Sequence, residues 1–233
     1  MAYQHSPFIV SWRRLIAVSD VLGLSIASSS FAGVAAAASP PAPIVVYDPT
    51  GSQCNCAPVP AAAPGFTATN LSEVGVLGTW NNTDVWSVGQ IGPSSSINLG
   101  QYLSFTVTPS AATKFDTLTY SKQSYQGQGP QNAAVRTSLD GFATNVASVT
   151  GLNPAGLDQI TFDLASLPAT SSKIEFRIYF FNTPSTGQDW ADLVSTNRGG
   201  TGLILTGQVT SPGGSTPSPA GGWNQVVNQP TAP

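Results

Sequence analysis

The clearest strand pattern in the chain is the stretch Lys173-Ile174-Glu175-Phe176-Arg177-Ile178-Tyr179-Phe180-Phe181. Apolar side chains fall at every second position, so they share one face of an extended chain. The residues on this face are Ile174, Phe176, Ile178 and Phe180. The pattern predicts a long strand with one side buried in a core.

Six further runs read as strands, and turn signals separate them. They are residues 44–48, 101–108, 114–120, 134–139, 159–164 and 202–209. No helical periodicity of useful length occurs after residue 40. We therefore predict an all-β chain with a jelly-roll-like β-sandwich over residues 70–210. An extended segment with the first strand, 39–69, precedes it, and a disordered tail rich in Pro, Gly and Ser, 211–233, follows it.

Residues 1–38 have the pattern of a secretory signal peptide. Arg13 and Arg14 precede a stretch of apolar and small residues that ends in four alanines, Ala35 to Ala38. We expect cleavage after Ala38 and a secreted or cell-surface protein. The alternative is a retained membrane anchor, which the serines and glycines and the lack of a basic stop disfavour. No later stretch is apolar for long enough to cross a bilayer, so we expect no membrane insertion after cleavage.

The only histidine, His5, lies in this leader. A mature chain without histidine excludes Ser-His-Asp and Cys-His catalysis and a His-ligated zinc site. We therefore expect no cofactor and no enzymatic activity. Two catalytic alternatives stay open, a carboxylate pair and a serine with a lysine base, but no motif marks either. The lysines available as that base are Lys114, Lys122 and Lys173.

The charge and the cysteine content of the chain limit the classes of partner and metal that it can bind. Charged residues are 8% of the chain, and from Ser39 onward six basic residues face ten acidic ones, a net charge of −4. Nucleic acid needs basic patches, so it is a poor partner. Cys54 and Cys56 form a C-x-C pair, too few ligands for a structural metal. They form a small local disulfide or stay as thiols, or they link two chains and support self-association.

One segment resembles a known family. It runs Gly127-Gln128-Gly129-Pro130-Gln131-Asn132-Ala133-Ala134-Val135-Arg136-Thr137-Ser138-Leu139-Asp140-Gly141-Phe142 and is followed by the 159–164, 173–181 and 202–209 strands. This is similar to a β-sandwich domain of exported bacterial proteins, many with a PEP-CTERM sorting signal. The resemblance covers about residues 44–210 and implies export and a sandwich fold. The C-terminal Pro-Glu-Pro, apolar helix and basic end of that signal are absent, which leaves sorting by that route open.

Aromatic and basic residues are the candidate ligand-binding groups. Flat rings near loop tips stack on sugars, and the candidates are Trp80, Trp86, Trp190 and Tyr125. The alternative for Trp80 and Trp86 is that they cover the open end of the core. Arg136 and Arg177 have outward parity in their strands. They pair across strands with Asp163 or Glu175, or they line a face that binds a sugar or a carboxylate.

The sequence offers oxygen ligands for a structural calcium. Asp140 and Asp192 are the candidate ligands, with Asp48 and Asp189 as further oxygen donors, and no EF-hand spacing is present. A structural alternative for Asp140 is a tight hairpin turn with Gly141.

Together these features predict an exported, non-catalytic β-sandwich protein of the cell surface or extracellular matrix. We expect it to bind polysaccharide or matrix through aromatic and polar loops at one end. One alternative is a structural envelope or sheath component that self-assembles. A second alternative is a secreted hydrolase that depends on carboxylates.

Overall fold

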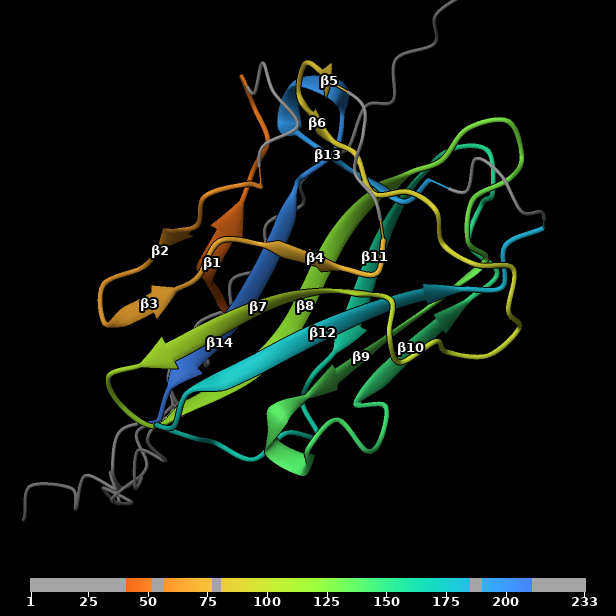
Figure 1. Cartoon of the computed structure of the whole chain (residues 1–233). Helices are drawn as coiled ribbons and strands as arrows, with labels where there is room; N and C mark the ends of the chain where they lie inside the picture. The colour runs from red at the N-terminus through yellow and green to blue at the C-terminus, as the bar shows by residue number, and fades with distance from the viewer. Residues whose placement is uncertain (1–40, 52–56, 77–80, 185–189, 211–233) are drawn as a thin grey trace, which may run out of the picture. The chain divides into compact units, whose positions relative to one another are not determined.

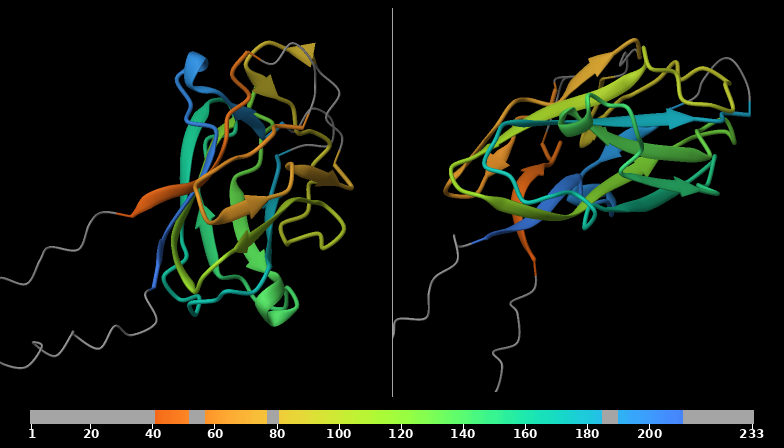
Figure 2. Two further views of the ribbon diagram at one scale, coloured as in Figure 1. Left: turned by 90° about the vertical axis from the view of Figure 1, so that its left-hand side faces the viewer. Right: turned by 90° about the horizontal axis from the view of Figure 1, so that it is seen from below.

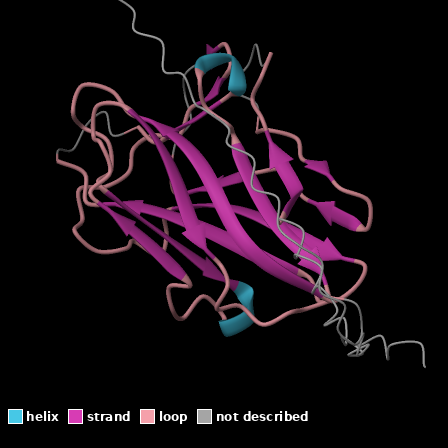
Figure 3. Cartoon of the chain, turned by 180° about the vertical axis from the view of Figure 1, so that it is seen from behind, coloured by secondary structure: helices cyan, strands magenta, loops and turns pink. Residues whose placement is uncertain are grey.

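A computed structural model describes residues 41–51, 57–76, 81–184 and 190–210, apart from the side chains of 81–82. These residues form two antiparallel sheets packed face to face, which confirms the predicted all-β sandwich (Figures 1 and 2). Figure 3 shows strands almost throughout, with helix confined to two short 3-10 turns, η1 (Ser138–Asp140) and η2 (Thr196–Arg198). Neither of these described helices has the length or apolar character to cross a membrane.

Sheet A has eight strands. In order across the sheet they are β2 (Ala61–Ala62), β1 (Ala42–Tyr47), β14 (Leu203–Val209), β8 (Thr113–Gln123), β13 (Asp192–Val194), β6 (Val85–Trp86) and β5 (Asn81–Asn82), and β11 (Leu157–Asp163) also pairs with β8. Sheet B has six. They are β10 (Ala147–Thr150), β9 (Asn132–Thr137), β12 (Ile174–Phe181), β7 (Tyr102–Pro109) and β3 (Phe66–Ala68), with β4 (Ser72–Val74) also on β7.

Successive strands cross between the two sheets. The chain passes from β7 in sheet B to β8 in sheet A, back to β9 and β10, and on to β11, β12 and β13 in alternation. Such crossing is typical of jelly-roll-like sandwiches. It brings the ends of strands that are distant in sequence together at the ends of the sandwich.

The core follows from the alternation in the sequence. Phe105 of β7 and Phe176 of β12 stack at 5.2 Å, and Tyr47 and Phe115 from sheet A meet these two rings edge-on at 5.3 and 5.4 Å. All four are at most 1% exposed. Burial of one such side chain stabilises the fold by about 1.5–3 kcal/mol. The strand that decides the fold therefore lies at the centre of sheet B with its apolar face inward.

The predicted hairpin turn at Asp140-Gly141 is wrong in detail. β9 and β10 do pair antiparallel, but η1 and a loop connect them instead of a two-residue turn. Gly141 and Phe142 both take left-handed backbone, with φ of 68° and 63°. The Asp140 carboxylate accepts hydrogen bonds from the backbone N–H groups of Ala143 and Thr144 and from the Thr144 hydroxyl. Asp140 therefore closes this loop.

Candidate functional site

Two of the predicted aromatic residues flank one end of a strand pair in sheet A. β13 pairs with β8 so that Asp192 lies opposite Gln123 and Leu193 opposite Lys122. Trp190 comes two residues before this ladder and Tyr125 two residues after it, so both residues lie at the same end of the ladder. Both residues are half-buried. We call Trp190 and Tyr125 the aromatic pair.

The Trp190 ring lies against the backbone of Gly89. A Cβ at position 89 would come within 2.4 Å of Cζ3 and 2.5 Å of Cε3 of the indole. Glycine is the residue that allows a ring and a backbone to approach this closely. The indole is therefore supported from one side by the Gly89 backbone.

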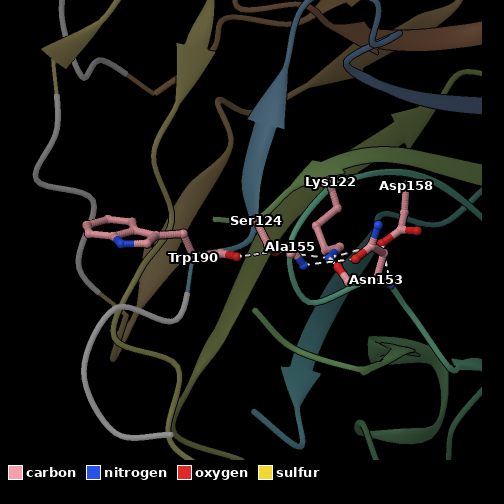
Figure 4. A network of polar contacts seen from close by, with 6 residues as sticks. All are labelled: Lys122, Ser124, Asn153, Ala155, Asp158 and Trp190. Carbon is pink, nitrogen blue, oxygen red and sulfur yellow. Dashed lines mark hydrogen bonds and ion pairs between the residues drawn. The ribbon is translucent and has the colours of Figure 1, made fainter. Parts of the chain in front are cut away.

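A buried polar network holds the backbone of Trp190 (Figure 4). The Ser124 hydroxyl donates to the Trp190 carbonyl at 2.5 Å, and Lys122 Nζ donates to Ser124 Oγ at 2.9 Å. Lys122 Nζ also donates to the Asn153 carbonyl at 2.6 Å and forms an ion pair with Asp158 Oδ2 at 3.0 Å. The Lys122 side chain is 0% exposed. All three ammonium protons thus have an acceptor, which is what a buried lysine requires.

The network also fixes the neighbouring loop. Asp158 Oδ2 accepts the Asn153 N–H at 2.9 Å, and Asn153 Oδ1 accepts the Ala155 N–H at 2.9 Å. Burial lowers the pKa of Lys122, and the hydrogen bond and charge of Asp158 oppose that shift. Side chains held in this way are preorganised, so a ligand bound above them orders few groups.

Lys122 and Ser124 have the contact that the serine–lysine alternative requires, but their environment does not suit catalysis. Ser124 is 1% exposed, and its proton is given to the Trp190 carbonyl. An attacking oxygen needs space for a substrate carbon, and this oxygen is enclosed on both sides. A Cβ at Gly129, for example, would lie 2.0 Å from Ser124 Oγ. The two residues support the aromatic pair.

A buried carboxylate lies next to the pair. Asp192 is 3% exposed, and its Oδ1 accepts the Val88 N–H at 3.0 Å. Burial raises the pKa of Asp192 to about 7, against the opposing effects of the Val88 N–H and the Arg198 charge, and the Glu73 charge raises it further. The sequence did not indicate this proximity of Glu73 and Asp192. Glu73 lies opposite the core residue Leu103 in the β4–β7 register, which is the signal that places it on the inner side.

The charge of Asp192 also affects the pKa of two tyrosines. Burial raises the pKa of Tyr120 and Tyr125, and the Asp192 charge raises both further. The Tyr120 hydroxyl donates to the Ala191 carbonyl at 2.7 Å. The Tyr125 hydroxyl oxygen is buried and has no hydrogen-bond partner in the described part of the chain. Tyr125 therefore retains hydrogen-bonding capacity at the candidate site.

The other candidate residues from the sequence do not join the aromatic pair in one described site. Trp86 is 3% exposed and belongs to the core, so its proposed contact with a ligand is wrong and the core-covering alternative is right. Trp80, Cys54 and Cys56 lie outside the described residues. Asp140 follows β9 of sheet B at one end, whereas Asp192 starts β13 of sheet A at the other (Figure 1). The structure does not bring this calcium pair together, and the described residues contain no group of three His, Cys, Asp or Glu able to hold a metal.

The predicted partner Glu175 is right for Arg177, but the pairing runs along one strand and not across strands. Arg177 Nε contacts Glu175 Oε1 at 2.8 Å, but Glu175 is on the same strand. Arg136 Nε donates to Asn145 Oδ1 at 2.8 Å and Nη1 to the Phe142 carbonyl at 2.9 Å. The register in fact sets the two arginines opposite each other on β9 and β12. Both lie on the outer face of sheet B.

Comparison with known proteins gives distant structural matches alone. No family model and no curated protein matches the chain. One solved structure is the family 32 carbohydrate-binding module of C. perfringens NanJ in complex with galactose, with a TM-score of 0.32 and 14% identity over 62% of this chain and 94% of that one. A second is a Clostridium perfringens module in complex with GalNAc-β-1,3-galactose. Its TM-score is 0.31, and its sequence is 13% identical over 60% of this chain and 94% of that one. A third is the K1 cleaved adhesin domain of Lys-gingipain from Porphyromonas gingivalis. Its TM-score is 0.32, and its sequence is 14% identical over 64% of this chain and 93% of that one. At these TM-scores the likeness assigns no function to this chain.

Proposed function

We propose that this protein is exported and binds polysaccharide at the cell surface or in the extracellular matrix, without catalysis. The observation that carries the proposal is the aromatic pair, two half-buried aromatic residues that flank the same end of the β13–β8 ladder. Flat aromatic faces stack on the C–H faces of sugar rings.

The rigid support of the pair favours this function. Weak stacking contacts add up to useful affinity when the rings need not be ordered on binding. Gly89 supports the Trp190 ring, and Ser124 and Lys122 hold its carbonyl from within the sandwich. Each of these contacts is made by a residue on or next to a strand, which positions a binding group better than a long loop does.

The same contacts support a non-catalytic role. The hydroxyl of Ser124 and the ammonium of Lys122 are both fully engaged in the network. Asp140 is engaged with its own loop. Lys122 and Asp140 are two of the residues named for the hydrolase alternatives, and each of them has a structural use.

The test is affinity electrophoresis of the chain from Ser39 onward through gels that contain a panel of neutral and acidic polysaccharides. Each gel is run with calcium and with chelator, so that a calcium requirement is visible. We expect retardation by at least one polysaccharide, and loss of it in Trp190→Ala and Tyr125→Ala. Leu99→Ala is the matched control, because Leu99 is an exposed apolar side chain outside the pair, 60% exposed. Retardation that is the same in all four proteins would overturn the proposal, as would no retardation by any polysaccharide.

A further inference from the structure

A row of polar side chains crosses the outer face of sheet B. The registers set Arg136 of β9 opposite Arg177 of β12, Arg177 opposite Ser104 of β7, and Ser104 opposite Ser72 of β4. The hydroxyl oxygens of Ser72 and Ser104 are 3.0 Å apart. We call these four residues the arginine row. With strands about 4.8 Å apart, the row spans roughly 14 Å across the sheet.

Arg177 is held rigidly within the row. Its guanidinium carbon lies 3.5 Å from the centre of the Phe142 ring and 4.3 Å from the centre of the Tyr102 ring. Its Nε is bonded to Glu175. Burial acts to lower the pKa of Arg177, but Glu175 and the Tyr179 hydroxyl outweigh this effect and the pKa is raised. Its side chain is 23% exposed, so the fixed guanidinium still reaches solvent.

Arg136 adds a second fixed positive charge. Its Nε and Nη1 are bonded to Asn145 and to the Phe142 carbonyl, and its guanidinium carbon lies 5.7 Å from the centre of the Tyr179 ring. Within the described part of the chain, Arg136 forms no ion pair with a carboxylate. Two like charges opposite each other in a sheet destabilise it unless something compensates them. Glu175 compensates one of the two.

A buried tyrosine lies next to the pair of arginines. Tyr179 is 1% exposed, and its hydroxyl interacts with Arg177 and raises the pKa of that guanidinium. The guanidinium of Arg136 lies over the ring of the same tyrosine. Tyr179 therefore helps to hold both arginines in place.

We propose that the arginine row is a second binding surface, for the carboxylate or sulfate groups of an acidic polysaccharide. A guanidinium edge binds such groups through two parallel hydrogen bonds. The serines extend the row with hydroxyl groups that can contact sugar hydroxyls along the same line. The proposal rests on the proposed function in taking the ligand to be a polysaccharide, but it uses none of the residues of the aromatic pair.

The test uses the chain from Ser39 onward, with polygalacturonate, dextran sulfate and unsubstituted dextran as probes. The variants are Arg136→Gln, and Arg177→Lys, which keeps the charge and loses the planar fork. Lys173→Gln is the matched control, since it removes one positive charge from an exposed residue at the start of the same strand. Trp190→Ala is measured in parallel, and thermal unfolding confirms that each variant folds.

We expect at least one acidic polymer to bind and dextran to bind at least tenfold more weakly at this surface. Arg136→Gln and Arg177→Lys should each weaken acidic binding about tenfold, and Lys173→Gln should leave it within twofold. Acidic binding that survives in Trp190→Ala supports the row even if the proposed function of the aromatic pair fails. Equal binding by the wild type and both arginine variants, equal loss in Lys173→Gln, or no binding of either acidic polymer would overturn the inference.

Discussion

Replacement of Asp192 by Asn should remove most of the pH dependence of stability between pH 5 and 8. The pKa of Asp192 is raised from 3.8 to about 7 by burial, so the folded state holds this proton more tightly than the unfolded state. The contribution of Asp192 therefore favours folding below about pH 4 and is lost as the pH rises to about 7. The full difference is about 4 kcal/mol, of which roughly 2 to 3 kcal/mol falls between pH 5 and pH 8.

Asn is a suitable replacement because its side-chain oxygen still accepts the Val88 N–H and cannot ionise. Glu73, Arg198, Tyr120 and Tyr125 are the other groups that interact electrostatically with Asp192. The pKa values of the two tyrosines are raised above 10, outside this range. Residues 39–233 contain no histidine, so no side chain there titrates at its ordinary pKa in this interval.

The assay is urea unfolding of residues 39–233 at pH 5.0 and pH 8.0, followed by tryptophan fluorescence. We expect the wild type to lose roughly 2 to 3 kcal/mol of unfolding free energy at the higher pH and Asp192→Asn to lose less than about 1 kcal/mol. Glu73→Gln should give an intermediate loss, because the Glu73 charge contributes to the shift. Asp163→Asn, on an exposed residue of β11, is the control. If the wild type and Asp192→Asn depended on pH equally, the account of this buried carboxylate would be refuted.

Three other substitutions test the support of the site and the loop that Asp140 closes. Lys122→Met should reduce the unfolding free energy by about 3 kcal/mol in urea titrations, since it leaves the carboxylate of Asp158 and two further acceptors without their donor; a loss under 1 kcal/mol would contradict the network. Gly89→Ala should displace the Trp190 ring and weaken polysaccharide binding about tenfold while the protein stays folded at 25 °C, and unchanged affinity would show that the ring position is irrelevant. Asp140→Ala should cost about 1 kcal/mol at pH 7, by analogy with helix caps, and this difference should vanish as the pH falls below the lowered pKa of Asp140; a cost that persists in acid would contradict the role of the carboxylate.

The sequence was sufficient for the long strands. β7, β8, β9, β11, β12 and β14 all have at least six residues, enough for the period of two to be visible. Strands of two or three residues carry no such period, so β4, β6 and β13 were not predicted. Because β13 was not predicted, the sequence could not show which residues come together at the site. Trp190 and Tyr125 are both candidates from the sequence, but their place at the same end of one ladder depends on the pairing of β13 with β8.

The buried network could have been anticipated in part. Leu118 and Tyr120 face the core, and the next residue in the same phase of β8 is Lys122. Extending the predicted 114–120 strand by two residues would have placed this lysine inside and required a partner for it. The identity of the partner could not be predicted, because Asp158 comes opposite Lys122 only through the β8–β11 pairing.

The most direct test of the central claim is the NMR spectrum of the tryptophan indole N–H groups during titration with the polysaccharide that binds most tightly. Comparison with Trp190→Phe assigns the Trp190 signal, and the buried Trp86 is the internal control. We expect the Trp190 signal to shift progressively to saturation while the Trp86 signal stays in place. A Trp190 signal that does not move at saturating polysaccharide would contradict the claim that the aromatic pair is the binding site.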